Sequence, residues 1–468
     1  NHDMIIDQDY TFLNCPNILI EGDHKIIIQP GIDLTINRCT LKAKCNKMWD
    51  GIYVSDVNSI LTIQSTSNLE QAKNAVVSEN GGIFTISNTN FTNNHICIKV
   101  DPYSGTHLGT VISSVFSSVT GALLSPYNGS NIRMFKGVEI NEVNQITIGN
   151  FALAGQQNKF DNMDYGIWSY LSNVNVYNNK FDNMSTTQNQ NCITCPCQAG
   201  TAICASSLKG FYRTLNVGGT GLRQNKFMKN QYGIWCNRFM HLNADNNDIR
   251  QTVRTAIRNE NSPTANINIT NNIVNRFNIG TEILDCGQNS NTFISQNTYN
   301  TSVPSFFGPF INNTAILIQN SFSSSHELEI SYNNIQKVNN GIFLRQVDNF
   351  NISPGSSSDI FENDIKFGVV NNLTSSFFYG IRLESSSGLS ITNNHIFKTN
   401  NTNPILAVVD NLRGVSLNMS ANNTVANNTI DKMGAGIRAA GNCYPSTIER
   451  NALNQNYYGV EGQMFANI

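Results

Sequence analysis

Short runs in which apolar and polar residues alternate recur along the whole chain, and two motifs accompany them. The first motif is Asn-x-aromatic or Asn-x-aliphatic, as in Asn158-Lys159-Phe160. The second follows after a short gap and reads Gly-Ile-x-apolar, as in Gly166-Ile167-Trp168. Because side chains alternate between the two faces of a strand, each run predicts a short strand with one buried face.

The two motifs define a repeat. Further copies of the first begin at Asn179, Asn225, Asn247, Asn297, Asn363, Asn394, Asn428 and Asn451, and copies of the second at Gly51, Gly233, Gly341, Gly380 and Gly436. A unit of about 21–25 residues with three short strands and no helical period is typical of one coil of a parallel β-helix.

The predicted fold is therefore all-β, a single right-handed parallel β-helix over residues 1–468. The repeat register is lost near 101–135, 185–221 and 300–325, so inserted loops are expected there. Neither end of the sequence resembles the atypical cap that repeat proteins normally carry, and we expect the chain to be part of a longer protein.

Asparagine is unusually frequent, with 74 residues in 468. An inward Asn at each corner can hydrogen-bond the backbone of its own turn and the Asn of the next coil, and Asn also tolerates left-handed backbone angles. We therefore expect a stack of hydrogen-bonded Asn side chains along the coils.

Charge limits the classes of partner. Charged residues make up only 13% of the chain, and 30 basic residues against 32 acidic ones give a net charge of −2. A surface so poor in positive charge argues against nucleic acid. No apolar stretch is long enough for a transmembrane helix.

The N-terminal part carries a more specific pattern. It runs through Ile28-Gln29-Pro30-Gly31-Ile32-Asp33-Leu34-Thr35-Ile36, then Cys39, Met48-Trp49-Asp50-Gly51-Ile52-Tyr53-Val54, Leu61-Thr62-Ile63 and Glu70-Gln71-Ala72. This pattern resembles the large secreted β-helix proteins of Bacteroidota, which are substrates of the type 9 secretion system. The resemblance implies an exported, extracellular or cell-surface protein that is adhesin-like and passes through the type 9 translocon.

The residue after Gly-Ile should point outward, and across successive coils these residues form a column. They are Tyr53, Trp168, Cys204, Trp235, Arg258, Phe343, Arg382 and Arg438. Aromatic and arginine side chains on a flat face can stack on sugar rings and hydrogen-bond their hydroxyls or carboxylates. We predict that Trp168, Trp235, Arg258, Arg382 and Arg438 bind a polysaccharide or cell-surface glycan. The alternative is that the 185–221 insertion covers the two tryptophans.

A second candidate is a pair of nearly identical segments, Lys159-Phe160-Asp161 and Lys180-Phe181-Asp182, which lie 21 residues apart. This spacing should place Asp161 beside Asp182, where two carboxylates could bind Ca²⁺ or share a proton near Lys159 and Lys180. The alternative is a solvated ladder of Asp–Lys pairs on neighbouring coils.

Cysteine is the last conspicuous feature, because Cys192, Cys195, Cys197 and Cys204 cluster within thirteen residues. In an exported protein such a cluster favours disulfides that staple a loop, with free thiols or a zinc site as alternatives. The spacing is not that of a zinc ribbon, and the seven histidines have no metal-ligand spacing, so no metal site or cofactor is expected.

The favoured function is a non-enzymatic cell-surface stalk or adhesin-like protein with a lateral face for glycans. The alternative is a polysaccharide lyase or glycoside hydrolase that acts on extracellular polysaccharide, with Asp161, Asp182, Lys159 and Lys180 as its candidate catalytic residues. The fold alone does not separate the two.

Overall fold

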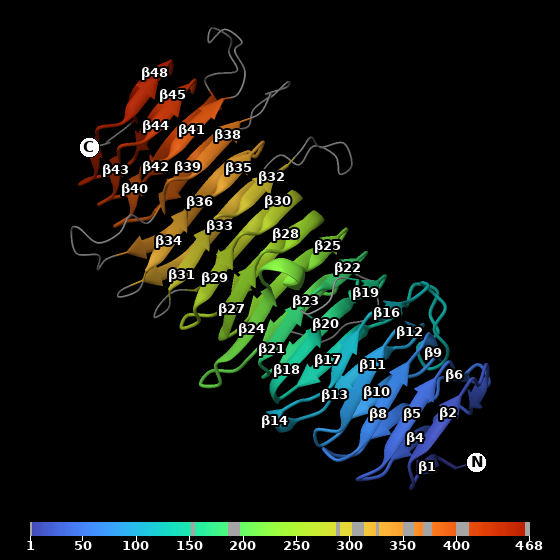
Figure 1. Ribbon diagram of the computed structural model, residues 1–468. Helices are drawn as coiled ribbons and strands as arrows, with labels where there is room; N and C mark the ends of the chain where they lie inside the picture. Colours follow the sequence, from blue (N-terminus) through green and yellow to red (C-terminus); the bar gives the residue numbers. More distant parts are fainter. Residues whose placement is uncertain are drawn as a thin grey trace. The chain divides into compact units, whose positions relative to one another are not determined.

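The structure is a computed structural model that describes residues 2–150, 155–185, 197–286, 291–301, 313–323, 327–349, 360–367, 377–398 and 411–463. The chain divides into two compact units. Figure 1 labels strands of both units along the sequence. The first unit is Asn1–Met240 with Asp245–Asp248, and the second is His241–Ala244 with Ile249–Ile468. Each unit is described by itself.

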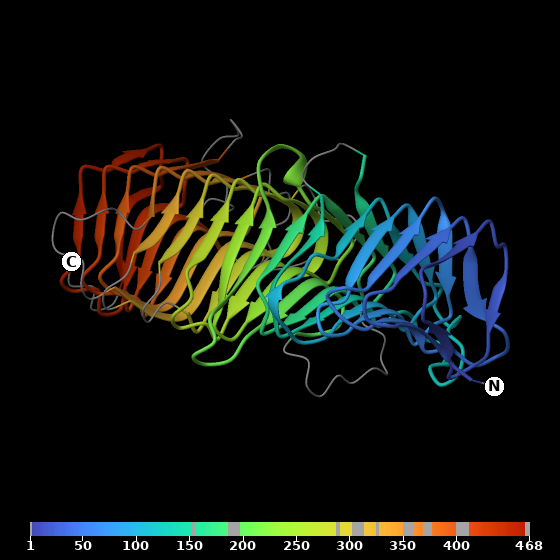
Figure 2. The ribbon, with the colours of Figure 1, turned by 60° about the horizontal axis from the view of Figure 1, so that its bottom comes forward.

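In the first unit three kinds of strand alternate along the chain, and the named strands pair in parallel from coil to coil (Figure 2). The strands are β1 (Met4–Ile6), β2 (Tyr10–Leu13), β3 (Ile18–Ile20), β4 (Lys25–Ile28), β5 (Asp33–Asn37), β6 (Thr40–Ala43), β7 (Gly51–Val54), β8 (Ile60–Gln64), β9 (Ser67–Glu70), β10 (Asn74–Ser78), β11 (Ile83–Ser87), β12 (Thr89–Thr92), β13 (Ile96–Val100), β14 (Tyr103–Thr106), β15 (Thr110–Ile112), β16 (Val115–Ser117), β17 (Lys136–Asn141), β18 (Val143–Gly149), β19 (Asn158–Asp161), β20 (Tyr165–Tyr170), β21 (Val174–Tyr177), β22 (Asn179–Asp182), β23 (Thr201–Ser206), β24 (Arg213–Gly218), β25 (Lys226–Met228) and β26 (Tyr232–Asn237).

The second unit repeats the pattern, and the boundary falls within β27 (Met240–Asp245) and β28 (Asp248–Glu260). Its further strands are β29 (Ile267–Thr270), β30 (Ile273–Leu284), β31 (Thr292–Ser295), β32 (Thr298–Asn300), β33 (Thr314–Ser323), β34 (Leu328–Ser331), β35 (Asn334–Gln336), β36 (Asn340–Asn349), β37 (Ile360–Phe361), β38 (Asp364–Phe367), β39 (Phe378–Glu384), β40 (Ser390–Thr392), β41 (His395–Lys398), β42 (Leu412–Asn418), β43 (Thr424–Ala426), β44 (Thr429–Asp431), β45 (Ala435–Ala440), β46 (Thr447–Glu449), β47 (Ala452–Asn454) and β48 (Tyr458–Gln463).

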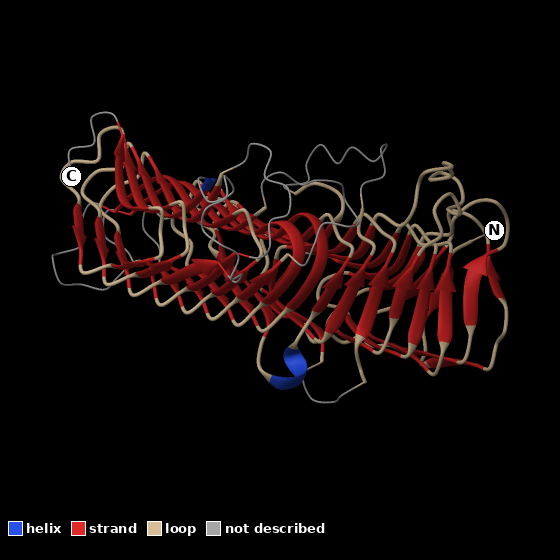
Figure 3. Ribbon diagram, turned by 90° about the horizontal axis from the view of Figure 1, so that it is seen from above, coloured by secondary structure: helices blue, strands red, loops and turns tan. Residues whose placement is uncertain are grey.

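The predicted right-handed parallel β-helix is confirmed. Strands dominate both units, and the described residues hold one short 3-10 helix, η1 (Gly221–Arg223) (Figure 3). The core lies inside the coils, where like residues stack in register. The aromatic residues of the Asn-x-aromatic motif show this most clearly, because the rings of Phe160, Phe181 and Phe227 stack with centroids 4.9 and 5.0 Å apart.

The glycine of the Gly-Ile motif has a steric cause. A Cβ at Gly166 would lie 2.6 Å from the carbonyl oxygen of Ala202 on the next coil, and a Cβ at Gly341 would lie 2.4 Å from that of Gly380. Any side chain there would push the coils apart, so the motif marks the point where successive backbones approach most closely.

The predicted Asn stack is present in each unit. The first unit contains Asn158, Asn179, Asn225 and Asn247, and the second contains Asn272, Asn297, Asn333, Asn363, Asn394, Asn428 and Asn451. Asn272 and Asn333 were missed by the motif search. In the first coils the equivalent position holds Cys39, whose backbone N–H donates to Ser67 Oγ.

One detail of the predicted corner is wrong. The stacked Asn does not itself adopt the left-handed conformation; the residue before it does, except before Asn158 and Asn225. That residue is often not Asn, since Gln296, Tyr332 and Glu362 have φ angles of 58°, 54° and 52°. The side-chain hydrogen bonds of the following Asn therefore hold a corner that the local sequence does not favour.

The predicted loop boundaries are too wide. The stretch 101–135 contains β14, β15 and β16, and only 118–135 lacks strands. The stretch 185–221 contains β23 and β24, with 186–196 outside the described residues. The stretch 300–325 contains β33, with 302–312 and 324–325 outside the described residues. The register returns sooner than the motifs reveal because these strands lack the full Asn or Gly-Ile signature.

Candidate ligand-binding site

The predicted outward column exists in each unit. In the first unit Glu139, Trp168, Cys204 and Trp235 pair in register on β17, β20, β23 and β26, so the two tryptophans lie two coils apart. In the second unit the column reads Phe343, Arg382, Ser416, Arg438 and Glu461.

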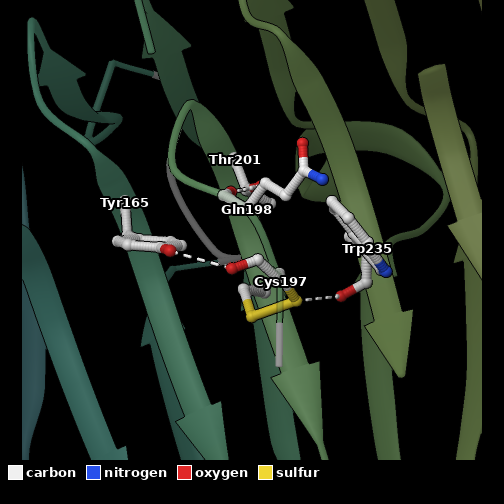
Figure 4. Close-up of a disulfide and its surroundings, with 6 residues drawn as sticks. Tyr165, Cys197, Gln198, Thr201 and Trp235 are labelled. Atoms are coloured by element: carbon white, nitrogen blue, oxygen red, sulfur yellow. Dashed lines mark hydrogen bonds between the residues drawn. A yellow bond between two sulfur atoms is a disulfide. The ribbon is translucent and has the colours of Figure 1, made fainter. Parts of the chain in front are cut away.

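The two tryptophans are nevertheless covered. Residues 197–200, here called the cover segment, precede β23 and are tied to it by a disulfide between Cys197 and Cys204. Figure 4 shows Tyr165 and Trp235 on either side of this disulfide. The Tyr165 hydroxyl donates to the Cys197 carbonyl at 2.9 Å, and Cys197 Sγ lies 3.5 Å from the carbonyl oxygen of Trp235.

The exposed tryptophan platform is thus not present in this structure. Trp168 is 8% exposed and Trp235 is 3% exposed, and both belong to a buried cluster with Tyr165, Tyr232 and the disulfide. Sugar rings stack on open aromatic faces, whereas these indoles already pack against protein atoms. Trp168 and Trp235 therefore lie beneath a part of the 185–221 segment, as the alternative interpretation predicts.

The disulfide confirms that the cysteine cluster is cross-linked, as expected, and gives one pairing that the sequence left open. Cys192 and Cys195 lie outside the described residues. The free thiols elsewhere include Cys15, Cys39, Cys45, Cys97, Cys286 and Cys443. Among the described residues no group of three or more His, Cys, Asp or Glu side chains is arranged to hold a metal ion.

A charged cluster next to Trp168 was not predicted from the sequence. Lys136 Nζ lies 2.7 Å from Glu139 Oε2 and 3.9 Å from the centre of the Trp168 ring. The ring of His95 stacks on Tyr127 at 3.6 Å, on the turn before β13. Simple strand alternation places Lys136 inside the coil together with Val138. Lys136 nevertheless forms an ion pair with Glu139, three residues further along the chain, a contact that strand alternation does not predict.

The ionisation of this cluster has clear physical causes. Burial, together with the charge of Lys136, lowers the pKa of His95 to about 4, so its imidazole is neutral at pH 7. Burial also lowers the pKa of Lys136. Burial acts to raise the pKa of Glu139, but the charge of Lys136 and the hydrogen bonds from Lys136 and Asn141 together lower it. A neutral imidazole near an ammonium–carboxylate pair is a set of groups that can exchange protons.

The two aspartates lie where the spacing predicts, since Asp161 and Asp182 pair in register on β19 and β22. Each is matched by a lysine of its own strand rather than of the neighbouring coil: Lys159 lies 2.9 Å from Asp161 and Lys180 lies 3.3 Å from Asp182. Burial acts to raise the pKa of Asp161, but the hydrogen bonds from Asn183 and Lys159 lower it overall. A shared proton would require a raised pKa, so the geometry favours the ion-pair interpretation; Ca²⁺ binding there stays a prediction.

A serine and a histidine also meet in the first unit, without forming a catalytic pair. The backbone N–H of Gly109 donates to His107 Nδ1 at 2.9 Å, so Nε2 carries the proton and donates to Ser78 Oγ at 2.8 Å. Ser78 Oγ in turn donates to the Gly82 carbonyl. With both ring nitrogens engaged, this histidine cannot accept a proton from the serine, and the contact is structural.

This pair predicts an acid-sensitive first unit. His107 is 4% exposed, and burial lowers its pKa from 6.5 to about 4. The unfolded chain therefore binds a proton that the folded chain excludes, and stability present above pH 6.5 is lost as the pH falls toward 4, by about 3 kcal/mol for this group. Denaturant unfolding of His107→Gln should lose less stability between pH 7 and pH 4.5 than the original chain. His24→Gln, at a partly exposed ring, is the control, and an equal pH slope for His107→Gln would contradict the assignment.

In the second unit, Arg258 is already neutralised. Its guanidinium contacts Glu260, and its Nη1 lies 2.9 Å from Glu282 Oε2. Two carboxylates thus bracket one arginine, which leaves no positive charge in excess for a ligand. The predicted binding role of Arg258 finds no support in this geometry.

In later coils of the second unit, arginines outnumber the carboxylates that they contact. Arg345, Arg382, Arg413 and Arg438, on β36, β39, β42 and β45, are here called the arginine strip. Arg382 and Arg345 share Glu384, at 2.8 and 3.6 Å. Arg413 and Arg438 share Glu461, at 3.1 and 3.7 Å. Arg345 and Arg413 were missed by the motif search because neither follows Gly-Ile.

Aromatic rings accompany the strip. The Arg382 guanidinium lies 4.6 Å from the centre of the Phe343 ring and 4.7 Å from that of Tyr379. Arg413 lies 4.7 Å from the centre of the Phe377 ring, and Phe377 is 44% exposed. Stacking on a ring fixes the plane of a guanidinium while its N–H groups remain free for a planar acceptor.

Comparison with known proteins agrees with the fold. The sequence profile of the family described as right handed beta helix region matches residues 314–467. Among solved structures, a double mutant of the periplasmic alginate epimerase AlgG is 13% identical, with 96% of this chain and 86% of that chain covered and a TM-score of 0.36. Unsubstituted AlgG is 11% identical, with coverage of 93% and 78% and a TM-score of 0.35. No curated protein matches the chain by sequence.

The sequence predicts no transmembrane helix. No helix among the described residues has both the length and the apolar character needed to cross a bilayer.

Proposed function

We propose that this chain is a non-enzymatic, exported cell-surface protein, adhesin-like or a stalk, that binds glycans through the arginine strip and its aromatic rings. The observation that supports this is the set of guanidinium–ring contacts on β36, β39 and β42. Such a surface offers apolar faces for sugar rings and planar donors for their hydroxyl or carboxylate groups. Arg382 and Arg438, two of the predicted ligand-binding residues, belong to it.

The proposal includes the location. The N-terminal pattern around Met48-Trp49-Asp50-Gly51 resembles type 9 secretion substrates of Bacteroidota. We propose on that basis that the chain crosses the outer membrane through the type 9 translocon. The buried disulfide supports export, because disulfides persist in oxidising compartments.

A second candidate function is a polysaccharide lyase or glycoside hydrolase. The observation that favours it is the cluster of Lys136, Glu139 and His95, which supplies charged and neutral proton-exchanging groups on one face of the first unit. Within the described part of the chain, no hydrogen bond joins the His95 ring to the side chains of Lys136 and Glu139. The non-enzymatic function therefore ranks first.

One screen tests both candidates. The purified chain is incubated with uronic-acid and neutral polysaccharides, with and without Ca²⁺, and both retention and new unsaturated or reducing ends are measured. We expect retention without product. Phe343→Ala should weaken retention about tenfold, because the ring that orients Arg382 is lost, while Phe397→Ala on β41 should not.

The outcomes separate the candidates. Product formation that Glu139→Gln abolishes would establish the enzyme and reject the non-enzymatic proposal. Retention that falls equally in Phe343→Ala and Phe397→Ala would place the glycan elsewhere than on the strip.

A further inference from the structure

The arginine strip carries more positive charge than its own protein partners neutralise. Four guanidiniums face two carboxylates, Glu384 and Glu461, so the local charge is 4 − 2 = +2. The chain as a whole has a net charge of −2, so the arginine strip is positive in a protein that is negative overall. A folded protein that holds like charges together without enough counter-charge loses stability unless an anion binds there.

We propose that the strip is a subsite for an anionic polysaccharide, in which Arg413 and Arg438 together hold one acidic group of the chain. This inference rests on the proposed glycan-binding function and names its substrate class. The acidic group is a carboxylate of a uronic acid or a sulfate ester; both carry a negative charge and neighbouring oxygens that accept paired N–H donors of a guanidinium.

The burial of Arg413 and the lack of a hydrogen bond at its Nε indicate that an anion binds here. Arg413 is only 6% exposed, and its Nε makes no hydrogen bond among the residues that the structure describes. Nε of Arg438 also makes no hydrogen bond within the described residues, and it lies 3.7 Å from Glu461 Oε2. Buried donors are normally satisfied, so these two groups on neighbouring strands are donors that their shared carboxylate, Glu461, leaves unsatisfied.

Small side chains lie beside both arginines on one side: Arg413 pairs in register with Ala435 on β45, and Arg438 pairs with Ser416 on β42. On the other side Arg413 pairs with Tyr379 and Arg438 pairs with Glu461. The two guanidiniums also repel each other: burial, with the charge of Arg438, lowers the pKa of Arg413. An anion bound between them would remove that repulsion.

The test compares ligands of matched length on the full chain. Calorimetric titrations use an oligogalacturonate, a sulfated oligosaccharide and a neutral oligosaccharide at low and high salt. We expect the acidic ligands to bind at least tenfold more tightly than the neutral one, with an advantage that shrinks at high salt. Preference for the carboxylated or for the sulfated ligand identifies the acidic group.

Variants locate the site. Arg438→Ala should lower affinity for the acidic ligand about tenfold and leave the neutral one unchanged. Lys366→Ala, which removes a positive charge from β38 in the same unit, should leave both unchanged. Arg438→Lys keeps the charge but loses the planar fork, and it should recover only part of the affinity. Unchanged binding of the neutral ligand shows that each variant is folded.

Each outcome of these titrations either supports or overturns the inference. Equal affinity for acidic and neutral ligands would overturn the inference and leave glycan binding intact. Equal losses in Arg438→Ala and Lys366→Ala would also overturn it, since only general charge would matter. Absence of binding to every oligosaccharide would reject the proposed function together with the inference.

Discussion

Asn333→Ala is expected to lower the free energy of unfolding of the second unit by about 2–6 kcal/mol. The side chain accepts a hydrogen bond from the backbone N–H of Asn297 at 3.0 Å and donates one to the carbonyl of Ile294 at 2.8 Å. Asn333 is 1% exposed, so alanine would leave both backbone groups buried and unpaired. Each such group costs about 1–3 kcal/mol. Denaturant unfolding measured by circular dichroism checks the value.

The adjacent residue supplies a matched control. Asn334 begins β35 on the outer face, and its side chain accepts a hydrogen bond from Gln336, the next outward residue of that strand. Asn334→Ala changes the same atoms one position along the chain and should shift stability by less than about 1 kcal/mol. Comparable losses in the two variants would mean that the stacked amides contribute little beyond filling space.

Such amide stacks explain why the fold was predictable. A β-helix repeats one coil, so each structural requirement returns in the sequence at every turn: an amide at the corner, a glycine where backbones approach, an aromatic residue such as Phe181 in the core. The requirements act on neighbouring coils only, and a short motif is enough to record them. Asn272 and Asn333 were missed although their triplets, Asn272-Ile273-Val274 and Asn333-Asn334-Ile335, fit the Asn-x-aliphatic motif.

The candidate sites were less predictable because they depend on departures from the repeat. The outward direction of Trp168 and Arg382 follows from alternation and was correct. Whether such a residue is free depends on groups outside the motif: the cover segment over Trp168, two carboxylates around Arg258, and Arg413 beside Arg438. These contacts join residues at irregular separations, so no periodicity encodes them.

Removal of the disulfide by Cys197→Ser with Cys204→Ser is expected to release the cover segment and expose two tryptophans without unfolding the coils. A cross-link across a sequence separation of seven contributes about 2–3 kcal/mol. The coils keep their inward cores, because Trp168 and Trp235 lie on the outer face of β20 and β26. Tryptophan fluorescence should shift to longer wavelength and become accessible to a soluble quencher.

The third tryptophan and a free thiol provide the controls. Trp49 is fully buried inside the first unit, so about one third of the fluorescence should stay protected from the quencher, which unfolding of the unit would not allow. Cys97→Ser changes a buried free thiol and should leave the spectrum unchanged. The exposed indoles would then form the flat aromatic column that the register places two coils apart, and retention of neutral glycans should rise. Unchanged quenching after loss of both cysteines would show that Tyr165 and Tyr232 hold the cover segment by themselves.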